Sequence, residues 1–386
     1  MRRAASRRRS SRWCAEVRAI VMSRVYADPA TRGKLKALAG LGVSVTAVVP
    51  DRWTPVGLGA EQQTAWGEEG ALRTVPIPVR GGTAPGGDPT WHRPTLRGLL
   101  TELRPEIIQI EEEPWTRVAG TAAALARRLR VPYVVLTRES LRGAHGALGR
   151  LRRSRVLGHA RGLIGVNELA VKLVGRQRPT LPARVIPQLG VALPVRAARP
   201  ERSGLTIGFF GRLIPEKGLD LLFRACVKLV GRWTISVVGT GPAQEELEGL
   251  AERLGIAGRV TWFGALPRQR VDEVWSGLDC VVLPSRTAPG WVEGSPRAAL
   301  EAMANGVVVV GSTAGALPET VGAAGVIVPE EDVEAIAAAL QRLHDEPAER
   351  GRLAAEGRRR AMEEYTDAAV AAKTLRFWRE AIAATP

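Results

Sequence analysis

The sequence predicts an α/β protein made of two successive domains, each with a parallel β-sheet covered by helices on both faces. Three observations predict this fold class. Short runs rich in β-branched residues alternate with helical stretches along the whole chain, which is the pattern of β-α-β units. The alternation is interrupted once, close to residue 193. The chain of 386 residues is also too long for one ordinary hydrophobic core and suits two domains.

The first series of elements occupies residues 17–192. Strands are predicted at residues 17–22, 43–49, 106–110, 131–136 and 162–166, and the predicted helices include 31–39 and 121–130. Residues 1–16 are rich in arginine and lack the apolar run of a secretory signal, so we expect a basic, disordered tail there. Residues 193–203 carry prolines and arginines that interrupt the alternation, and we interpret them as the linker between the domains.

The second series occupies residues 204–365 and is more regular. Its predicted strands are 205–210, 234–238, 260–263, 280–283 and 307–310, and its predicted helices are 217–229, 242–254, 268–276, 296–305 and 332–343. Ligands of open parallel sheets bind beyond the carboxyl ends of the strands, so two such domains should face a common cleft. No strand follows the helix expected within residues 366–386, and we expect this helix to cross back to the first domain.

The composition excludes several classes of protein. The formal net charge is +16, but only six of the 55 basic residues are lysine, and such a skew is typical of a GC-rich coding bias. No stacking aromatics or recognition helix accompany the charge, so no specific nucleic-acid binding is expected. No apolar run is long enough to span a membrane. Three distant cysteines fit a reducing cytoplasm, and the basic charge would allow peripheral contact with an anionic membrane at its inner face.

The first candidate site follows the strand predicted at residues 205–210. Gly211, Arg212 and Lys217 lie where this strand ends and a helix begins. The free N–H groups of a helix start favour anions, and arginine and lysine both bind phosphate oxygens. We therefore interpret Arg212 and Lys217 as candidate phosphate ligands. The alternative is a solvated loop in which Glu216 neutralises Lys217.

The second candidate site contains two glutamates, Glu293 and Glu301, within residues 293–306. Ser295 and Pro296 predict a helix start, with serine at the N-cap and proline in the first turn. A carboxylate among small apolar residues is either exposed on one stripe of the helix or partly buried and hydrogen-bonded. Sugar hydroxyls donate hydrogen bonds and would suit both acids. The alternative is a chance interval between two unrelated glutamates.

Two further candidates are weaker. Gly239 and Gly241 form a tight turn after a predicted strand, where the backbone can approach a ligand closely. In the first domain, Glu111, Glu113 and Trp115 gather at the end of the strand at 106–110. A solvated acidic turn is the alternative interpretation of that cluster. The four histidines show no metal-ligand spacing with one another or with cysteine, so no metal site is expected.

Taken together, these segments resemble the retaining glycosyltransferases of family 4. That family has the GT-B architecture, in which two Rossmann-like domains face a cleft. The resemblance covers nearly the whole chain and is most specific between residues 208 and 329. Its motifs, in order, are Gly211-Arg212-x4-Lys217-Gly218, Gly239-x-Gly241-Pro242, Val260-x-Trp262-x-Gly264, Leu283-Pro284-Ser285, Glu293-x7-Glu301-Ala-Met-Ala-x-Gly306 and Gly315-x-x-Pro318-Glu319.

The resemblance implies transfer of a hexose from a nucleoside-diphosphate-sugar donor to a carbohydrate, lipid-linked or small-molecule acceptor. Residues matching Arg212 and Lys217 bind the donor diphosphate in the family. The residue matching Glu301 holds the ribose hydroxyls, and the one matching Glu293 faces the donor sugar. The donor is a substrate, and the two cations can neutralise its leaving group, so neither a metal nor a cofactor is expected. The implied set is catalytic Arg212, Lys217 and Glu293; donor-binding Gly211, Gly239, Gly241, Gly294, Ser295 and Glu301; and acceptor-side Glu111, Glu113 and Trp115.

The sequence also departs from the family pattern. The glycine pair common in the first loop is absent from residues 23–32, and an acid common near the linker is missing from residues 187–192. Pro296 has no N–H to offer a phosphate. The altered first loop favours the main alternative, a catalytically silent GT-B binding or scaffold protein. The presence of Arg212, Lys217, Glu293 and Glu301 argues against that alternative. A nucleotide-sugar epimerase of similar architecture is a further alternative, which the spacing of Glu293 and Glu301 disfavours.

Overall fold

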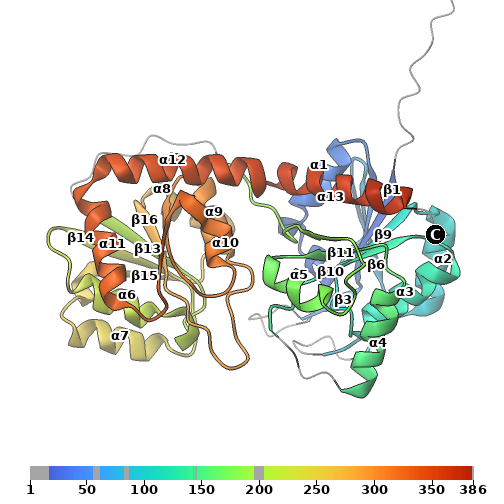
Figure 1. The fold of residues 1–386 in the computed structure, drawn as a ribbon, viewed down its shortest axis with the longest axis horizontal. Coiled ribbons are helices and arrows are strands. Elements are labelled where there is room, and N and C mark those ends of the chain that lie inside the picture. Colours follow the sequence, from blue (N-terminus) through green and yellow to red (C-terminus); the bar gives the residue numbers. More distant parts are fainter. Residues whose placement is uncertain are drawn as a thin grey trace, which may run out of the picture.

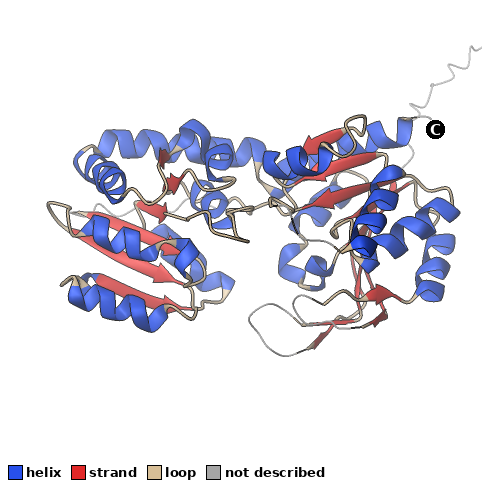
Figure 2. Ribbon diagram, turned by 60° about the horizontal axis from the view of Figure 1, so that its bottom comes forward, coloured by secondary structure: helices blue, strands red, loops and turns tan. Residues whose placement is uncertain are grey.

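The computed structural model describes residues 17–54, 61–81, 87–141, 143, 146–194 and 204–384, which form two α/β lobes side by side (Figure 1). The predicted tail at residues 1–16 lies outside the described residues, and so do residues 195–203 of the predicted linker. Each lobe has its own largely parallel sheet, with helices on both sides of the strands (Figure 2). The predicted fold class is thereby confirmed.

The sheet of the N-terminal lobe has eight strands in the order β12-β11-β10-β9-β1-β2-β6-β5. Neighbouring strands are parallel except β5, which pairs antiparallel with β6. The strands are β1 (Arg18–Met22), β2 (Ser44–Pro50), β5 (Gly67–Glu69), β6 (Leu72–Ile77), β9 (Ile107–Ile110), β10 (Tyr133–Thr137), β11 (Gly162–Gly165) and β12 (Ala183–Val185). Two short antiparallel pairs accompany this sheet: β3 (Arg52–Trp53) with β4 (Gln62–Gln63), and β7 (Val79–Arg80) with β8 (Thr90–Trp91).

Helices cover both faces of this sheet. They are α1 (Gly33–Gly40), α2 (Arg93–Leu103), α3 (Arg117–Arg128), α4 (Ala147–Gly158) and α5 (Glu168–Gly175). In the central strand β1, Ala19 and Val21 belong to one hydrophobic cluster, and Ile20 and Met22 belong to the cluster on the opposite face. A strand sends successive side chains to opposite faces, so β1 is buried on both sides and reads as a continuous apolar run.

The sheet of the C-terminal lobe has six parallel strands in the order β15-β14-β13-β16-β17-β18. Its strands are β13 (Leu205–Phe210), β14 (Trp233–Val238), β15 (Val260–Gly264), β16 (Cys280–Leu283), β17 (Val308–Ser312) and β18 (Val326–Val328). Its helices are α6 (Leu219–Cys226), α7 (Gln244–Arg253), α8 (Arg268–Ser276), α9 (Arg297–Ala304), α10 (Leu317–Val321) and α11 (Val333–Asp345). All these strands run the same way, so their carboxyl ends meet at one edge of the sheet.

Two long helices close the chain and connect the lobes. Helix α12 (Pro347–Glu364) packs along the C-terminal lobe, and α13 (Asp367–Ala383) continues onto the N-terminal lobe beside α1 (Figure 1). Leu375, Phe377 and Trp378 of α13 are buried in the same cluster as Ala19 and Val21 of β1. The predicted return of the last helix to the first domain is therefore confirmed, and its cause is the burial of one apolar face of α13.

Most predicted strands lie within about two residues of the observed ones, while several elements were not predicted. Helices α2, α4, α5, α10 and α12 and the strands β6, β12 and β18 are among those that the alternation did not reveal. Helix α9 begins at Arg297, and Pro296 rather than Ser295 occupies the N-cap position without a side-chain hydrogen bond. The prediction that Ser295 caps this helix is therefore wrong. Helix α3 begins at Arg117, four residues before the predicted start.

Candidate active site

The carboxyl ends of β13, β14 and β16 bring most of the predicted donor-side residues to one edge of the C-terminal sheet. Arg212 follows β13, the Gly239–Gly241 turn follows β14, and the loop after β16 leads to Glu293. This convergence follows from the parallel order of the three strands, which places the ends of neighbouring strands side by side. Segments far apart in the sequence thus share one surface facing the N-terminal lobe.

Lys217 and Glu293 form an ion pair at this edge. Lys217 Nζ lies 2.5 Å from Glu293 Oε2, and the Ser285 hydroxyl donates to the same oxygen at 3.0 Å. The side chain of Glu293 is 8% exposed and that of Lys217 is 20% exposed. The Lys217 ammonium also lies 5.4 Å from the centre of the Trp291 ring, within cation–π range. Lys217 therefore pairs with Glu293 and not with Glu216, the partner named in the alternative interpretation.

The loop that carries Lys217 is held by Arg286. Its guanidinium binds both carboxylate oxygens of Asp220 at 2.6 and 2.9 Å and donates to the Pro215 carbonyl at 2.6 Å. The Arg286 backbone N–H donates to the Glu216 carbonyl at 2.8 Å. A two-pronged arginine–carboxylate pair of this kind fixes geometry as well as adding energy. Lys217 therefore projects from a braced turn, while the neighbouring Arg212 is exposed.

The Gly239–Gly241 turn packs against the loop after β13. A Cβ added at Gly239 would clash with the Gly211 carbonyl oxygen, and one added at Gly241 would clash with the backbone of Leu213. Backbone hydrogen bonds join the two loops, from Leu213 N to the Thr240 carbonyl and from Ala243 N to the Leu213 carbonyl, both at 3.0 Å. These glycines let the two strand-end loops touch, and so they set the position of Arg212 and Lys217.

The backbone of Glu293 is supported by the loop after β17. The Ala316 N–H donates to the Glu293 carbonyl at 2.7 Å. Gly315 has φ +56°, and a Cβ there would clash with the same carbonyl oxygen. Only glycine adopts this conformation without strain and leaves room for the approach. The Gly315 motif thus acts by holding Glu293 in place.

Asn167 links the two lobes at the predicted donor side, and sequence reasoning missed it. Its Nδ2 donates to the Gly294 carbonyl at 2.5 Å and to Ser140 Oγ at 2.9 Å, while its Oδ1 accepts from the Ala170 N–H as the N-cap of α5. The next backbone N–H, of Glu168, donates to Glu319 at 2.8 Å. An asparagine directly after a predicted strand is a helix-start signal that could have drawn attention to this end of β11.

Gly294 and Ser295 lie in a cavity between the lobes. It has a volume of about 230 Å³, and its other lining residues include Asn167, Glu319, Tyr365 and Lys373. Burial raises the pKa of the Glu319 carboxyl above 4.5, while the hydrogen bond from the Glu168 backbone N–H acts in the opposite direction. This side of the cleft therefore combines backbone carbonyls, an acid and a lysine from both lobes.

Glu301 lines a different and larger interlobe cavity of about 550 Å³. Its carboxylate pairs with Arg297, one turn earlier on α9, at 2.7 Å, and its side chain is 25% exposed. The cavity is otherwise lined by Trp275 and Leu266 of the C-terminal lobe and by Asp28 and Thr31 of the N-terminal lobe, among others. An apolar wall beside an accessible carboxylate suits a nucleoside, whose base stacks through its flat aromatic faces and whose ribose donates hydrogen bonds.

The predicted acceptor residue Glu111 is fully buried within the N-terminal lobe. Its carboxylate pairs with Lys34 at 2.6 Å and accepts from Tyr26 at 2.8 Å and Gln188 at 3.1 Å. Gln109 also donates to it at 2.5 Å, and Gln109 in turn accepts from the Trp378 indole of α13 at 2.6 Å. A buried charge is stable only when paired and hydrogen-bonded, and Glu111 meets that condition with internal partners. Its position fits a structural role in seating α13 better than contact with an acceptor.

Glu113 and Trp115 have other surroundings. The Glu113 carboxylate accepts from the Thr137 hydroxyl at 2.7 Å and from the Arg138 N–H at 2.9 Å, and burial raises its pKa above 4.5. The Trp115 ring lies 5.7 Å from the Arg153 guanidinium. Both residues thus lie near the carboxyl ends of β9 and β10, and neither belongs to a solvated turn.

Within the described part of the chain, no cluster of three or more histidine, cysteine, aspartate or glutamate side chains is arranged to hold a metal ion. Among the same residues, no helix combines the length and apolar character needed to cross a membrane.

Comparisons with known proteins place this geometry in context. A family model described as "Glycosyl transferases group 1" matches residues 197–360, and one described as "Glycosyl transferase 4-like domain" matches residues 27–188. Together they cover most of the chain, one model for each lobe.

Relatives of known activity are similar over parts of their length. A GDP-mannose-dependent alpha-(1-6)-phosphatidylinositol monomannoside mannosyltransferase of Mycolicibacterium smegmatis is 34% identical over 44% of this chain and 47% of its own. A 2-deoxystreptamine glucosyltransferase of Streptomyces kanamyceticus is 28% identical over 62% of this chain and 68% of its own. The chain thus spans about half to two thirds of the length of these two relatives.

A solved structure shares the fold over nearly the full length. HepE of Anabaena in complex with UDP superposes with a TM-score of 0.71 at 16% identity, over 95% of this chain and 100% of its own. At this level of identity the likeness concerns the fold alone, which in both cases is a pair of α/β lobes.

Proposed function

The chain belongs to the glycosyl transferases group 1 family, and on that premise we propose that it is a retaining glycosyltransferase that uses a nucleoside-diphosphate-sugar donor. The observation that carries the proposal is the convergence of Arg212, Lys217 and Glu293 at one edge of the C-terminal sheet, facing the other lobe. The two relatives named above use or transfer mannose and glucose, so the proposed sugar is a hexose.

Arg212 and Lys217 would hold the donor diphosphate. Bond cleavage between sugar and phosphate leaves an additional negative charge on the nucleoside diphosphate. Two cations positioned beside that charge stabilise the transition state more than the ground state, which is how binding groups accelerate a reaction. Gly211, Gly239 and Gly241 would act through the backbone, because they allow the two loops to approach each other.

Glu293 would face the donor sugar, beside Gly294 and Ser295. In the ligand-free protein its carboxylate is occupied by Lys217 and Ser285. A diphosphate would draw Lys217 toward its own oxygens and release Glu293 to accept hydrogen bonds from the sugar hydroxyls. We assign Glu293 no covalent role, and the proposed retention proceeds by attack of the acceptor on the same face that the diphosphate leaves.

The base and ribose would occupy the cavity lined by Glu301 and Trp275. Its volume of about 550 Å³ lies within the range of small-molecule sites, roughly 300–1,000 Å³. No metal or cofactor takes part in the proposed reaction, since the donor is a substrate and the two cations supply the charge that a metal would otherwise supply. The HepE structure holds UDP, while one relative depends on GDP-mannose, so both bases need testing here.

The acceptor would enter from the N-terminal lobe, near Glu113 and Trp115. One relative acts on a phosphatidylinositol mannoside and the other on 2-deoxystreptamine, so a lipid-linked and a small-molecule carbohydrate are both proposed classes. A cytoplasmic location with peripheral contact at the inner membrane face would suit the lipid-linked class.

The test begins with the melting temperature of the purified protein in UDP-, GDP- and ADP-sugars. A ligand at 100 times its Kd stabilises the fold by about 2.7 kcal/mol. Lys217→Ala should reduce the shift, while Arg224→Gln, at an exposed position of α6, should keep it. The stabilising donor is then incubated with the protein and with acceptors of the two proposed classes, and the mixture is followed by NMR. A retaining transferase breaks the bond between sugar and diphosphate, releases nucleoside diphosphate and forms a glycosidic bond to the acceptor with unchanged anomeric configuration. An epimerase yields an altered sugar, and a scaffold binds the donor without turnover; either result would contradict the proposal.

A further inference from the structure

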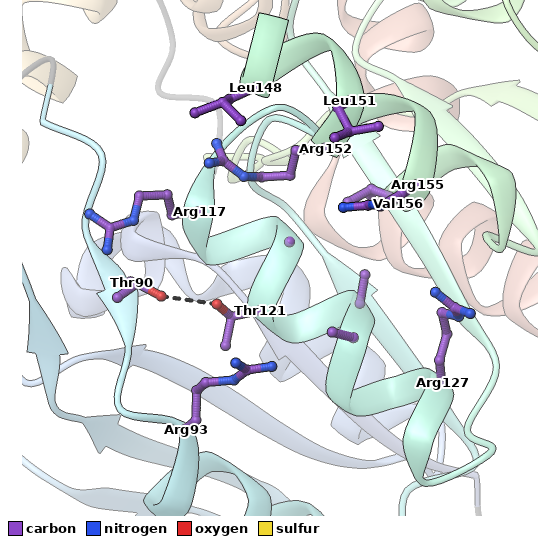
Figure 3. A pocket seen from close by; sticks show the side chains of 13 residues that line it. Thr90, Arg93, Arg117, Thr121, Arg127, Leu148, Leu151, Arg152, Arg155 and Val156 are labelled. Atoms are coloured by element: carbon purple, nitrogen blue, oxygen red, sulfur yellow. Dashed lines mark hydrogen bonds between the residues drawn. The ribbon is translucent and has the colours of Figure 1, made fainter.

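A concave surface of the N-terminal lobe, away from the ion pair of Lys217 and Glu293, is lined by five arginines. Arg93 comes from α2, Arg117 and Arg127 from α3, and Arg152 and Arg155 from α4. Figure 3 shows these side chains placed around the exposed side of α3, with those of α2 on one flank and those of α4 on the other. The pocket has a volume of about 390 Å³.

The charge of this arginine pocket is largely uncompensated. Of the described carboxylates, only Asp88 lies within ion-pair distance of any of the five guanidinium groups, 3.5 Å from Arg152. Asp88 also accepts the backbone N–H of Arg117 at 2.6 Å. Like charges gathered in one hollow repel each other and raise the local positive potential. An anion with several charges should therefore bind this surface more strongly than it would bind isolated arginines.

The walls of the pocket add two kinds of contact. The hydroxyls of Thr90 and Thr121, which line the pocket, bond to each other at 2.9 Å (Figure 3). The hydroxyl that accepts in this bond keeps its own hydrogen for a ligand oxygen. On the α4 side, Leu148 is 75% exposed and Leu151 is 46% exposed. These leucines share one helix face with Arg152 and Arg155, because residues three, four and seven apart lie on the same side. The pocket thus joins an anion-binding hollow to an apolar rim.

We propose that this arginine pocket is a second anion site, which binds a phosphate ester or diphosphate separately from the donor site. Guanidinium groups fork onto phosphate oxygens with two hydrogen bonds each, and one anion in the hollow is within reach of three helices. The phosphate has two sources of the same chemistry: a soluble phosphate ester, or the head group of an anionic lipid whose chains lie against Leu148 and Leu151. The proposal does not depend on the reaction at the donor site.

The test removes three of the charges without touching the internal bonds of the lobe. The pocket variant is Arg93→Gln/Arg117→Gln/Arg155→Gln, whose side chains are exposed. The matched control is Arg224→Gln/Arg253→Gln/Arg376→Gln, which makes the same change of net charge at exposed arginines outside the pocket. Both are made in a Lys217→Ala background, so that the donor site contributes little to phosphate binding, and equal melting temperatures verify the folds.

Two probes distinguish the sources. In the soluble arm of the test, calorimetry measures the affinity for inorganic pyrophosphate. In the lipid arm, sedimentation measures binding to phosphatidylcholine vesicles with and without phosphatidylglycerol. The affinity of the pocket variant should be lower than that of the control by about tenfold or more in at least one arm. The lipid source is assigned if the pocket variant binds the vesicles more weakly, Leu148→Gln has the same effect, and the affinity for pyrophosphate does not change. The soluble source is assigned if only the affinity for pyrophosphate falls. Equal affinity of pocket variant and control in both arms would overturn the proposal.

Discussion

Lys217 Nζ lies 2.5 Å from Glu293 Oε2, although 76 residues separate the two along the chain. The pair joins the loop after β13 to the loop after β16, and both loops end at the same edge of the C-terminal sheet. A cation proposed for the diphosphate and a carboxylate proposed for the sugar thus neutralise each other before the donor binds. Donor binding would have to exchange this ion pair for contacts with the two halves of the donor.

Removal of either proposed phosphate ligand should weaken nucleoside-diphosphate binding. Arg212→Ala and Lys217→Ala each delete a charged hydrogen bond worth roughly 1.5–3 kcal/mol, so affinity measured by calorimetry should fall about ten- to a hundredfold. Stability should separate the two variants. Lys217→Ala leaves the buried Glu293 with Ser285 alone and should lower the free energy of unfolding by about 1–2 kcal/mol, whereas Arg212 is exposed. Unchanged affinity in both variants would contradict the diphosphate assignment.

Glu301→Gln and Glu293→Gln should affect different steps. Glu301→Gln keeps the shape but loses a charged acceptor for the ribose, so nucleotide affinity should fall by on the order of 1–3 kcal/mol. Glu293→Gln should lower kcat more than it lowers affinity for the free nucleotide, because its proposed partner is the sugar. Kinetics and calorimetry on the same two proteins measure both effects. Normal nucleotide affinity together with a lower melting temperature in both variants would indicate that these residues are structural.

Turnover should not require a divalent cation. Arg212 and Lys217 would supply the positive charge at the leaving diphosphate, and so a chelator should leave the rate unchanged. The measurement is the transfer rate with EDTA, followed by addition of magnesium or manganese. A rate that EDTA abolishes and either metal restores would refute the metal-independent mechanism.

Asn167 should control how the lobes meet. Asn167→Asp keeps an oxygen to cap α5 at the Ala170 N–H but loses the Nδ2 donor to the Gly294 carbonyl. We expect it to retain the melting temperature, increase the radius of gyration in small-angle scattering and reduce kcat/KM. Asn167→Ala loses the cap as well and should also be less stable by about 1 kcal/mol. If Asn167→Asp matches the parent protein in radius of gyration and in kcat/KM, the hydrogen bond from Asn167 to the Gly294 carbonyl does not control how the lobes meet.

Glu113 should give stability a specific pH dependence. Burial raises the pKa of its carboxyl in the folded protein above the ordinary 4.5, so the folded state holds this proton more tightly than the unfolded state. Its contribution to stability is therefore complete at low pH and is lost as pH rises from about 4.5 through the raised pKa. Glu113→Gln removes the titration, so the stability of the variant relative to the parent should increase over that window. Parallel urea-unfolding profiles of the two proteins against pH would disprove the effect.

Local sequence determined the alternation of strands and helices and the order of the C-terminal motifs. The strand predicted at residues 205–210 is β13 without a shift, because its apolar, partly β-branched run is buried on both faces and ends at a glycine. Helices α2 and α4 escaped prediction because arginines interrupt their apolar pattern; the energy that holds them comes from packing on the sheet and not from their own periodicity.

Only the tertiary structure decided which charges meet. Three consecutive glutamates have separate partners: Glu111 pairs with Lys34, Glu112 with Arg24, and Glu113 bonds to Thr137 and Arg138. Likewise, the Asn167 amide bonds to the Gly294 carbonyl across 127 residues of sequence. The reason is physical. Strand and helix formation responds to neighbours a few residues away, whereas the burial and pairing of a charge depend on which distant segments the sheet order brings together.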